Sequence, residues 1–252
     1  MTEEELVKSW LRLCRDPRTP NEMLEKACYW ESISRPAELD IRLAAARNRS
    51  ASSELLANLA NINNLKLQIS VAGHPNLSES TAGKLMKTQL RELRRALASN
   101  PRIPLYVMKK LARDFEDVRS RLARNPGIPV SIMVDMTKEK SILVRRSLAS
   151  NPNLHGKILE FLSQDKDADV RKAIAMHDKI PSAGLAAMAS DPVTSVREAV
   201  FEMALKHFPH ESKIFETLAG FSDGLVADRA RSHLKTLNEQ PEPVQTPNEA
   251  AN

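Results

Sequence analysis

An arginine recurs at a nearly constant interval along the middle of this 252-residue chain. It follows the first apolar residue of a short repeated phrase at Arg42, Arg94, Arg119, Arg145, Arg171 and Arg197. A guanidinium group is planar and permanently charged, and its fork of N–H donors matches a carboxylate or a phosphate. If the phrases stack side by side, these arginines form a row that could recognise such groups.

Acidic residues precede four of these arginines by five or six positions. This spacing predicts a structural ladder in which each arginine joins adjacent repeats through a carboxylate. The members of the ladder are Arg119 with Asp114, Arg145 with Glu139, Arg171 with Asp165 and Arg197 with Asp191. The copy of the phrase that begins at Leu67 has Gln68 and Ile62 in the two places, as expected of residues that act as a pair.

Other basic residues have no carboxylate at this spacing. Arg42 and Arg94 have Pro36 and Thr88 at the position of the acid. With basic neighbours on the same predicted helices they form a candidate partner-binding surface, made of Arg42, Arg47, Arg94, Arg95, Arg121, Arg124, Arg146 and Lys172. The alternative is that these charges only form a solvated surface that keeps the protein soluble.

An internal repeat must position these residues. The phrase reads LRRALASNP from Leu93, VRSRLARNP from Val118, VRRSLASNP from Val144 and VRKAIAMHD from Val170. With weaker copies included, the starts fall near residues 41, 67, 93, 118, 144, 170 and 196. A constant period of about 26 residues is typical of proteins built from stacked repeats.

Each repeat predicts two short helices. Apolar residues such as Val118, Leu122 and Ala123 form the stripe of a first amphipathic helix. This helix ends at an asparagine, because a residue before proline is pushed out of the α region. A second proline, such as Pro104 or Pro129, then suits the first turn of the next helix, where its missing N–H costs nothing.

A column of polar residues marks the end of the first helix. It consists of Asn48, Asn100, Asn125 and Asn151, with His74 and His177 in the same place in two other copies. The last turn of a helix leaves backbone groups without intrahelical partners. We therefore predict that the column caps helix ends.

One such unit buries too little apolar surface to offset its ordering entropy, so neighbouring units must stack. We predict an all-α protein, an α-solenoid of about eight two-helix repeats. Residues 1–40 are expected to form an N-terminal capping repeat, 41–204 the regular repeats and 205–237 the C-terminal capping helices. The polar, proline-rich residues 238–252 are expected to be a disordered tail.

Composition agrees with a helical protein and points to an acidic partner. Seven glycines and 4% aromatic residues are too few for most β-sandwiches and barrels. The net charge is +5, but residues 1–40 and 209–252 each carry −3, which leaves +11 for the middle of the chain. Such an excess would attract an acidic partner if it falls on one face.

The phrase VRxxLAxNPxxPxxxLxxLAxD resembles the leucine-rich repeat variant family and, more broadly, short HEAT-like helical repeats. The resemblance covers roughly residues 9–237. It implies a right-handed superhelix that is used for binding rather than for chemistry. Some members of the variant family carry a cysteine-ligated iron–sulfur module, but Cys14 and Cys28 are the only cysteines here. We therefore expect two buried thiols and no cofactor.

No catalytic or metal-binding motif is evident. Gly83-Lys84 lacks the upstream glycine and the following hydroxyl of a phosphate-binding loop. His207 and His210 could share a helix face, but no third ligand stands near them in the sequence. No apolar run approaches the roughly 20 residues that span a bilayer. The expectation is a cytoplasmic protein that is not an enzyme and binds no metal.

These features predict a non-catalytic scaffold that holds another protein, with an acidic segment, on its concave face. The alternative is nucleic-acid binding, in which the basic central repeats follow a phosphate backbone. Only three aromatic residues, Tyr106, Phe115 and Phe161, lie between residues 41 and 200, which leaves little to stack on exposed bases. A third class, a HEAT-like glycosylase, would need a catalytic carboxylate that the sequence does not identify.

Overall fold

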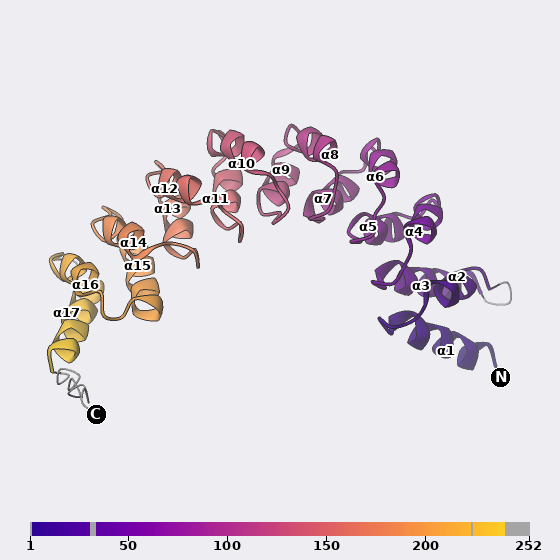
Figure 1. The fold of residues 1–252 in the computed structure, drawn as a ribbon, viewed down its shortest axis with the longest axis horizontal. Coiled ribbons are helices and arrows are strands. Elements are labelled where there is room, and N and C mark those ends of the chain that lie inside the picture. The colour runs from indigo at the N-terminus through magenta and orange to yellow at the C-terminus, as the bar shows by residue number, and fades with distance from the viewer. Residues whose placement is uncertain (1, 31–33, 223, 240–252) are drawn as a thin grey trace, which may run out of the picture. The chain divides into compact units, whose positions relative to one another are not determined.

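A computed structural model describes residues 2–30, 34–222 and 224–239, which form seventeen α-helices and no strand (Figure 1). The odd-numbered helices are α1 Glu3–Arg15, α3 Arg35–Arg47, α5 Leu65–Ala72, α7 Arg91–Ser99, α9 Glu116–Ala123, α11 Ile142–Ala149, α13 Ala168–Ala175, α15 Thr194–His207 and α17 Gly224–Glu239. The even-numbered helices are α2 Asn21–Cys28, α4 Ser53–Ala60, α6 Glu79–Met86, α8 Leu105–Leu111, α10 Val130–Thr137, α12 Gly156–Leu162, α14 Ser182–Met188 and α16 Ser212–Ala219.

The helices alternate between two layers. Each odd-numbered helix carries the repeated phrase, and it packs against the next odd-numbered helix of its unit and against an even-numbered neighbour. The chain divides into two compact units, Met1–Asn153 and Leu154–Asn252. The first contains α1 to α11 and the second contains α12 to α17. In each unit the architecture is the predicted α-solenoid.

The predicted apolar stripes form the core. Val118, Leu122 and Ala123 of α9 are completely buried, as are the corresponding residues of the neighbouring odd-numbered helices. The stripes predicted for the even-numbered helices are also buried, at Val107, Met108 and Leu111 and again at Ile158, Leu159 and Leu162. Both helices of a repeat therefore contribute to one continuous apolar layer.

The second proline of each repeat lies one position earlier than predicted. Pro104, Pro129 and Pro181 are the N-cap residues of α8, α10 and α14, with extended backbone, rather than their first helical residues. The fixed φ of proline suits this position equally well, because the N-cap residue contributes a carbonyl to the helix. The carbonyl of Pro104 accepts from the N–H of Val107 at 2.9 Å.

The asparagine column joins neighbouring repeats, as its capping role requires. The Asn125 amide donates to the carbonyls of Ala98 and Asn100 at 2.7 and 2.9 Å, at the end of α7. Its side-chain oxygen accepts from the N–H of Gly127 at 2.8 Å. Asn48, Asn100 and Asn151 donate to the preceding repeat in the same way. In each pair one carbonyl, such as that of Asn100, also accepts a backbone N–H, whereas the other, such as that of Ala98, has the asparagine amide as its hydrogen-bond donor.

The C-terminal prediction falls largely outside the described residues. Of the predicted tail, Asn238 and Glu239 form the end of α17, and residues 240–252 lie outside the described part. The division into units lies between the two helices of the repeat that begins at Val144, because α11 belongs to the first unit and α12 to the second. The boundaries proposed at residues 40 and 204 stay predictions.

Candidate functional site

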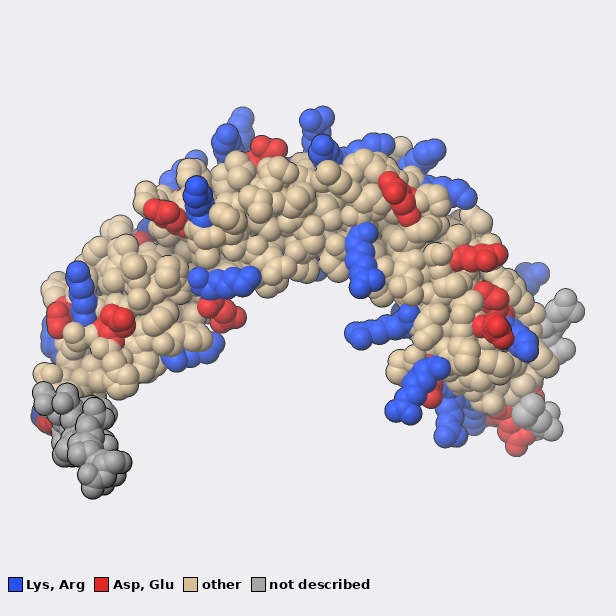
Figure 2. All heavy atoms as spheres, in the orientation of Figure 1, with Lys and Arg blue, Asp and Glu red and all other residues tan. Residues whose placement is uncertain are grey.

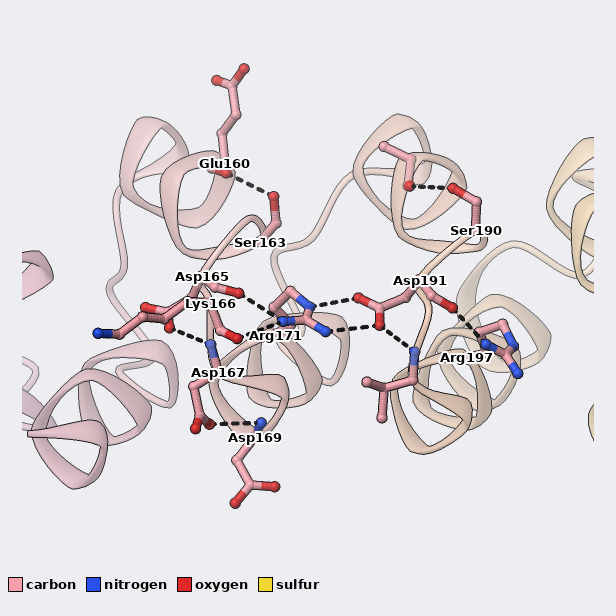
Figure 3. A network of polar contacts seen from close by, with 12 residues as sticks. Glu160, Ser163, Asp165, Lys166, Asp167, Asp169, Arg171, Ser190, Asp191 and Arg197 are labelled. Atoms are coloured by element: carbon pink, nitrogen blue, oxygen red, sulfur yellow. Dashed lines mark hydrogen bonds and ion pairs between the residues drawn. The ribbon is translucent and has the colours of Figure 1, made fainter.

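Ladder arginines and carboxylates form a line of ion pairs beside the N-terminal ends of the odd-numbered helices. Arg171 in α13 donates from Nε and Nη2 to the two carboxylate oxygens of Asp191, at 2.6 and 3.0 Å (Figure 3). Its Nη1 donates to the backbone carbonyl of Asp165 at 2.8 Å. The guanidinium group is thereby held on both sides.

The carboxylate partner is not the one that the spacing predicted. Arg171 pairs with the carboxylate 20 residues after it, in the following repeat, and not with the carboxylate of Asp165 six residues before it. The residue six positions earlier supplies its backbone carbonyl. Arg119 follows the same rule, with a bidentate pair to Glu139 at 2.8 and 3.1 Å and a bond to the carbonyl of Asp114. The ladder thus runs from one repeat to the next.

Arg94 belongs to this ladder, although we predicted it as a free cation. It donates to both carboxylate oxygens of Asp114, at 2.6 and 3.2 Å, and to the carbonyl of Thr88 at 3.1 Å. Only 9% of its side chain and 8% of that of Asp114 are exposed. Thr88 lacks a carboxylate but offers the same backbone carbonyl, and the true partner stands in the next repeat. Arg94 is therefore not available to a partner.

Arg42 is also engaged rather than free. It forms an ion pair with Glu38 one turn earlier in α3, and its Nε donates to the carbonyl of Cys28 at 3.1 Å. Position 62, where the next repeat would offer an acid, is Ile62. Gln68 of that repeat keeps only the backbone contacts, donating to the carbonyls of Ala60 and Ile62 at 3.2 Å.

Two further arginines of the predicted ladder are buried and hydrogen-bonded. Arg145 and Arg197 are 3% exposed, and each donates from Nη1 to a backbone carbonyl, that of Glu139 at 2.7 Å and that of Asp191 at 2.6 Å. Burial alone would raise the pKa of Asp191, but the hydrogen bonds from Arg171 and from the Val193 N–H hold this pKa below its ordinary value. The carboxylate is thus kept ionised in the folded protein.

A groove on the odd-numbered helices of the first unit gathers four of the predicted partner-binding residues. Its volume is about 270 Å³, and α7, α9 and α11 form it. The residues that line this arginine groove are Arg95, Arg121, Arg124, Arg146, Asp117, Ser120, Ser147, Ser150 and Leu143. Basic side chains project from many parts of the surface (Figure 2). The groove differs from the rest of the surface because four arginine side chains line the same small volume.

One carboxylate lines the arginine groove, and it already has partners. Asp117 accepts from Arg91 at 2.5–2.7 Å and lies 3.5 Å from Arg95. The hydrogen bond from Arg91 lowers the pKa of Asp117, which is therefore ionised. Asp117 is the one carboxylate among the residues that line the groove, and Arg91 and Arg95 share it. Arg121 and Arg124 are exposed and form no ion pair with any residue of the described part.

The other predicted residues lie elsewhere. Arg47 lines a hollow of about 620 Å³ against α1, together with Arg15, Arg49 and Asp40. Lys172 is half-buried on α13 in the second unit. The structure therefore brings together Arg95, Arg121, Arg124 and Arg146, and it does not bring Arg42, Arg47, Arg94 or Lys172 to the same place.

Our sequence reasoning missed the uncharged members of the groove. Ser120, Ser147, Ser150 and Leu143 were not singled out, although they fall on the same helix face as the arginines. We count positions from the first apolar residue of the phrase. Positions −1, +2, +3 and +6 then lie on one face of a helix with 3.6 residues per turn. That periodicity was the available signal.

The remaining sequence candidates are structural in their surroundings. Trp10 and Trp30 pack at 5.5 Å between ring centroids in the first repeat. Cys14 and Cys28 are fully buried, which raises the pKa of the thiols to about 11 and about 12. No group of three or more metal-ligating side chains occurs among the described residues. Within those same residues, none of the helices is long and apolar enough to cross a membrane.

By its fold, the chain is an α-helical repeat protein, an α-solenoid. No protein-family model and no curated protein matches its sequence. Among solved structures it is similar to a leucine-rich repeat variant with a novel repetitive structural motif, at 22% identity and a TM-score of 0.49, over 78% of this chain and 81% of the other. It is also similar to an engineered protein, at 17% identity and a TM-score of 0.24, over 92% and 96% of the two chains. A designed armadillo repeat protein matches at 15% identity and a TM-score of 0.21, over 94% and 95%.

Proposed function

We propose that the protein is a non-catalytic scaffold that holds an acidic segment of another protein in the arginine groove. The observation that carries this proposal is the convergence of Arg95, Arg121, Arg124 and Arg146 from three successive repeats on one groove. Asp117, the one carboxylate among the lining residues, already accepts from Arg91, and Arg121 and Arg124 form no ion pair within the described part of the chain. A cluster of like charges costs stability unless a ligand neutralises it, so its presence supports an anionic partner.

The form of the groove supports an extended segment as the ligand. Arg95 is on α7, Arg121 on α9 and Arg146 on α11, so successive layers present guanidinium groups along the stack. Ser120 and Ser147 share one hydrogen bond, which leaves one of the two hydroxyls with a proton to donate, and Leu143, which is 40% exposed, adds an apolar contact. A segment of protein can use all three kinds of contact at once.

The groove favours a peptide over exposed nucleic-acid bases. None of its lining residues is aromatic. Tyr106 and Phe161 belong to the even-numbered helices α8 and α12, and Phe115 precedes α9 beside Arg91, 4.9 Å from the guanidinium group. Base stacking on aromatic rings supplies much of the affinity of single-strand binders, and this surface lacks it.

The test uses a fluorescein-labelled twelve-residue peptide rich in Asp and Glu, measured by fluorescence anisotropy. We expect binding that weakens by about tenfold or more in the variant Arg121→Glu with Arg124→Glu, since two charge-assisted contacts become repulsions. The matched control is Lys109→Glu with Lys110→Glu, which reverses the same number of charges on α8. The control should bind within about twofold of wild type, because exposed charges at a distance are screened by salt.

Two results would contradict the proposal. Equal losses in the two variants would show that the peptide responds only to overall charge. Tighter binding of a random DNA duplex, with a steep dependence of affinity on salt that the Arg121 and Arg124 changes reduce, would assign the groove to a phosphate backbone. Melting temperatures of both variants are measured alongside, so that a loss of binding is not a loss of fold.

A further inference from the structure

The arginine groove offers more donors than a carboxylate can use. Four guanidinium groups line it, and the hydroxyls of Ser120 and Ser147 lie beside them, 2.7 Å apart. A carboxylate has two oxygens and one charge, so it satisfies at most two bidentate arginines. A phosphate monoester has three terminal oxygens and close to two charges at neutral pH, and it accepts from donors in several directions.

The charge within the groove also fits a dianion. Asp117 is shared between Arg91 and Arg95, which leaves Arg121 and Arg124 without a carboxylate in the described part of the chain. The two positive charges of Arg121 and Arg124 match the two negative charges that a phosphate monoester approaches at neutral pH. The groove, with a volume of about 270 Å³, has room for a phosphate group together with the side chain that bears it.

We propose that the arginine groove binds a phosphorylated serine or threonine in the partner segment. This inference rests on the proposed function, because it names the acidic group that the groove selects. Arg95, Arg121, Arg124 and Arg146 would contact the phosphate, and whichever hydroxyl of Ser120 and Ser147 accepts in their mutual hydrogen bond would donate its own proton to a remaining phosphate oxygen. Recognition by clustered arginines is the general solution for phosphorylated peptides, because bidentate contacts add to charge attraction.

The first experiment compares three peptides of one sequence by isothermal titration calorimetry. One carries a single phosphoserine, one carries two glutamates that match its charge, and one carries unmodified serine. We expect the phosphopeptide to bind about tenfold more tightly than the glutamate peptide, since charge-assisted contacts to a third oxygen are lost with carboxylates. The unmodified peptide should bind more weakly than both.

The outcomes separate this inference from the proposed function. If the glutamate peptide binds as tightly as the phosphopeptide, the phosphate inference is wrong and acidic-segment binding survives. If neither anionic peptide binds, both are wrong. If a single-stranded RNA of equal charge displaces the phosphopeptide at equal concentration, the groove recognises phosphate in nucleic acid, and the phosphopeptide inference is overturned.

The second experiment locates the phosphate within the groove. Guanidinium groups favour the dianion, so ³¹P NMR of the bound phosphopeptide should show the second pKa of the phosphate below its free value of about 6. Arg124→Lys keeps the charge but loses the bidentate fork, so it should weaken phosphopeptide binding more than glutamate-peptide binding. Lys110→Gln on α8 is the control and should change neither measurement. An unchanged phosphate pKa in the wild-type complex would overturn the inference.

Discussion

Two arginines that are adjacent in the sequence have opposite surroundings in the structure. Arg94 is buried in the ladder and pairs with Asp114 through two hydrogen bonds. Arg95 lies in the arginine groove with 43% of its side chain exposed, 3.5 Å from Asp117. Arg145 and Arg146 differ in the same way, the first buried and the second exposed.

The comparison shows that repetition serves two purposes in this protein. Neighbouring positions on a helix are separated by about 100°, so adjacent residues of the phrase point to different faces. One face meets a carboxylate of the next repeat and holds the stack together. The other face repeats a charge toward solvent, where like charges gather. A single short phrase therefore produces both the cohesion of the repeats and a candidate binding surface.

The largest expected effect is loss of a ladder pair. Arg94→Ala leaves the carboxylate of Asp114, only 8% exposed, without its partner. We expect the free energy of unfolding to fall by about 3–5 kcal/mol, as for other broken buried pairs. Arg95→Ala, one residue away, should change it by less than about 0.5 kcal/mol. Urea denaturation followed by circular dichroism measures both.

A compensating change sharpens the same test. Replacing both partners, as in Arg94→Met with Asp114→Leu, removes the unpaired charge and should recover most of the lost stability. If the single change Arg94→Ala has no more effect than Arg95→Ala, the distinction between ladder and groove is wrong.

The asparagine column should show the next largest effect. Asn125→Ala removes two hydrogen bonds to buried carbonyls and the acceptor for Gly127 N–H. The expected loss is about 2–3 kcal/mol, because the buried carbonyl of Ala98 then lacks a partner and that of Asn100 keeps only the 3.4 Å hydrogen bond from the Ile103 N–H. Arg124→Ala is the adjacent control and should leave the urea midpoint nearly unchanged. Equal midpoints for the two variants would argue against a capping role.

Acid should weaken the ladder of the second unit. The pKa of Asp191 is held below its ordinary value in the folded protein, so its contribution is present above about pH 4 and is lost as pH falls through the folded pKa. Asp191→Asn should lower the melting temperature at pH 7 and flatten its decline between about pH 4 and pH 2. Parallel pH profiles for variant and wild type would contradict the depressed pKa.

The smallest expected effect on stability is in the groove, where removing arginines should be neutral or slightly stabilising. Arg121→Ala with Arg124→Ala removes two exposed like charges that have no ion pair in the described part of the chain. The free energy of unfolding should stay the same or rise by less than about 0.5 kcal/mol, with a matching small rise in melting temperature. Any rise should shrink as salt is added, because salt screens the repulsion between exposed charges. Differential scanning calorimetry at low and high salt measures this. A clear loss of stability would mean that these arginines hold the fold together.

The repeat phrase was enough to predict helix positions and core residues. Val118, Leu122 and Ala123 are buried because their spacing defines one face of a helix whatever the neighbouring repeat contains. The groove was predicted only in part, since Arg95, Arg121, Arg124 and Arg146 were identified without Ser120 or Leu143. Repeated arginines can be recognised in the sequence by their charge. Serine and leucine occur on every face of a helix, so they can be assigned to the groove only when the helix face is known.

The local pattern of the chain determined the 26-residue period, the alternation of helices and the asparagine at the end of each first helix, because each depends on spacing within the repeat. Only the tertiary structure decided which carboxylate each arginine meets. Asp165 is six residues from Arg171 and Asp191 is twenty, yet the bidentate contact is with Asp191. The distance between stacked helices, which sequence separation does not measure, brings those two charges together and leaves the groove arginines facing solvent.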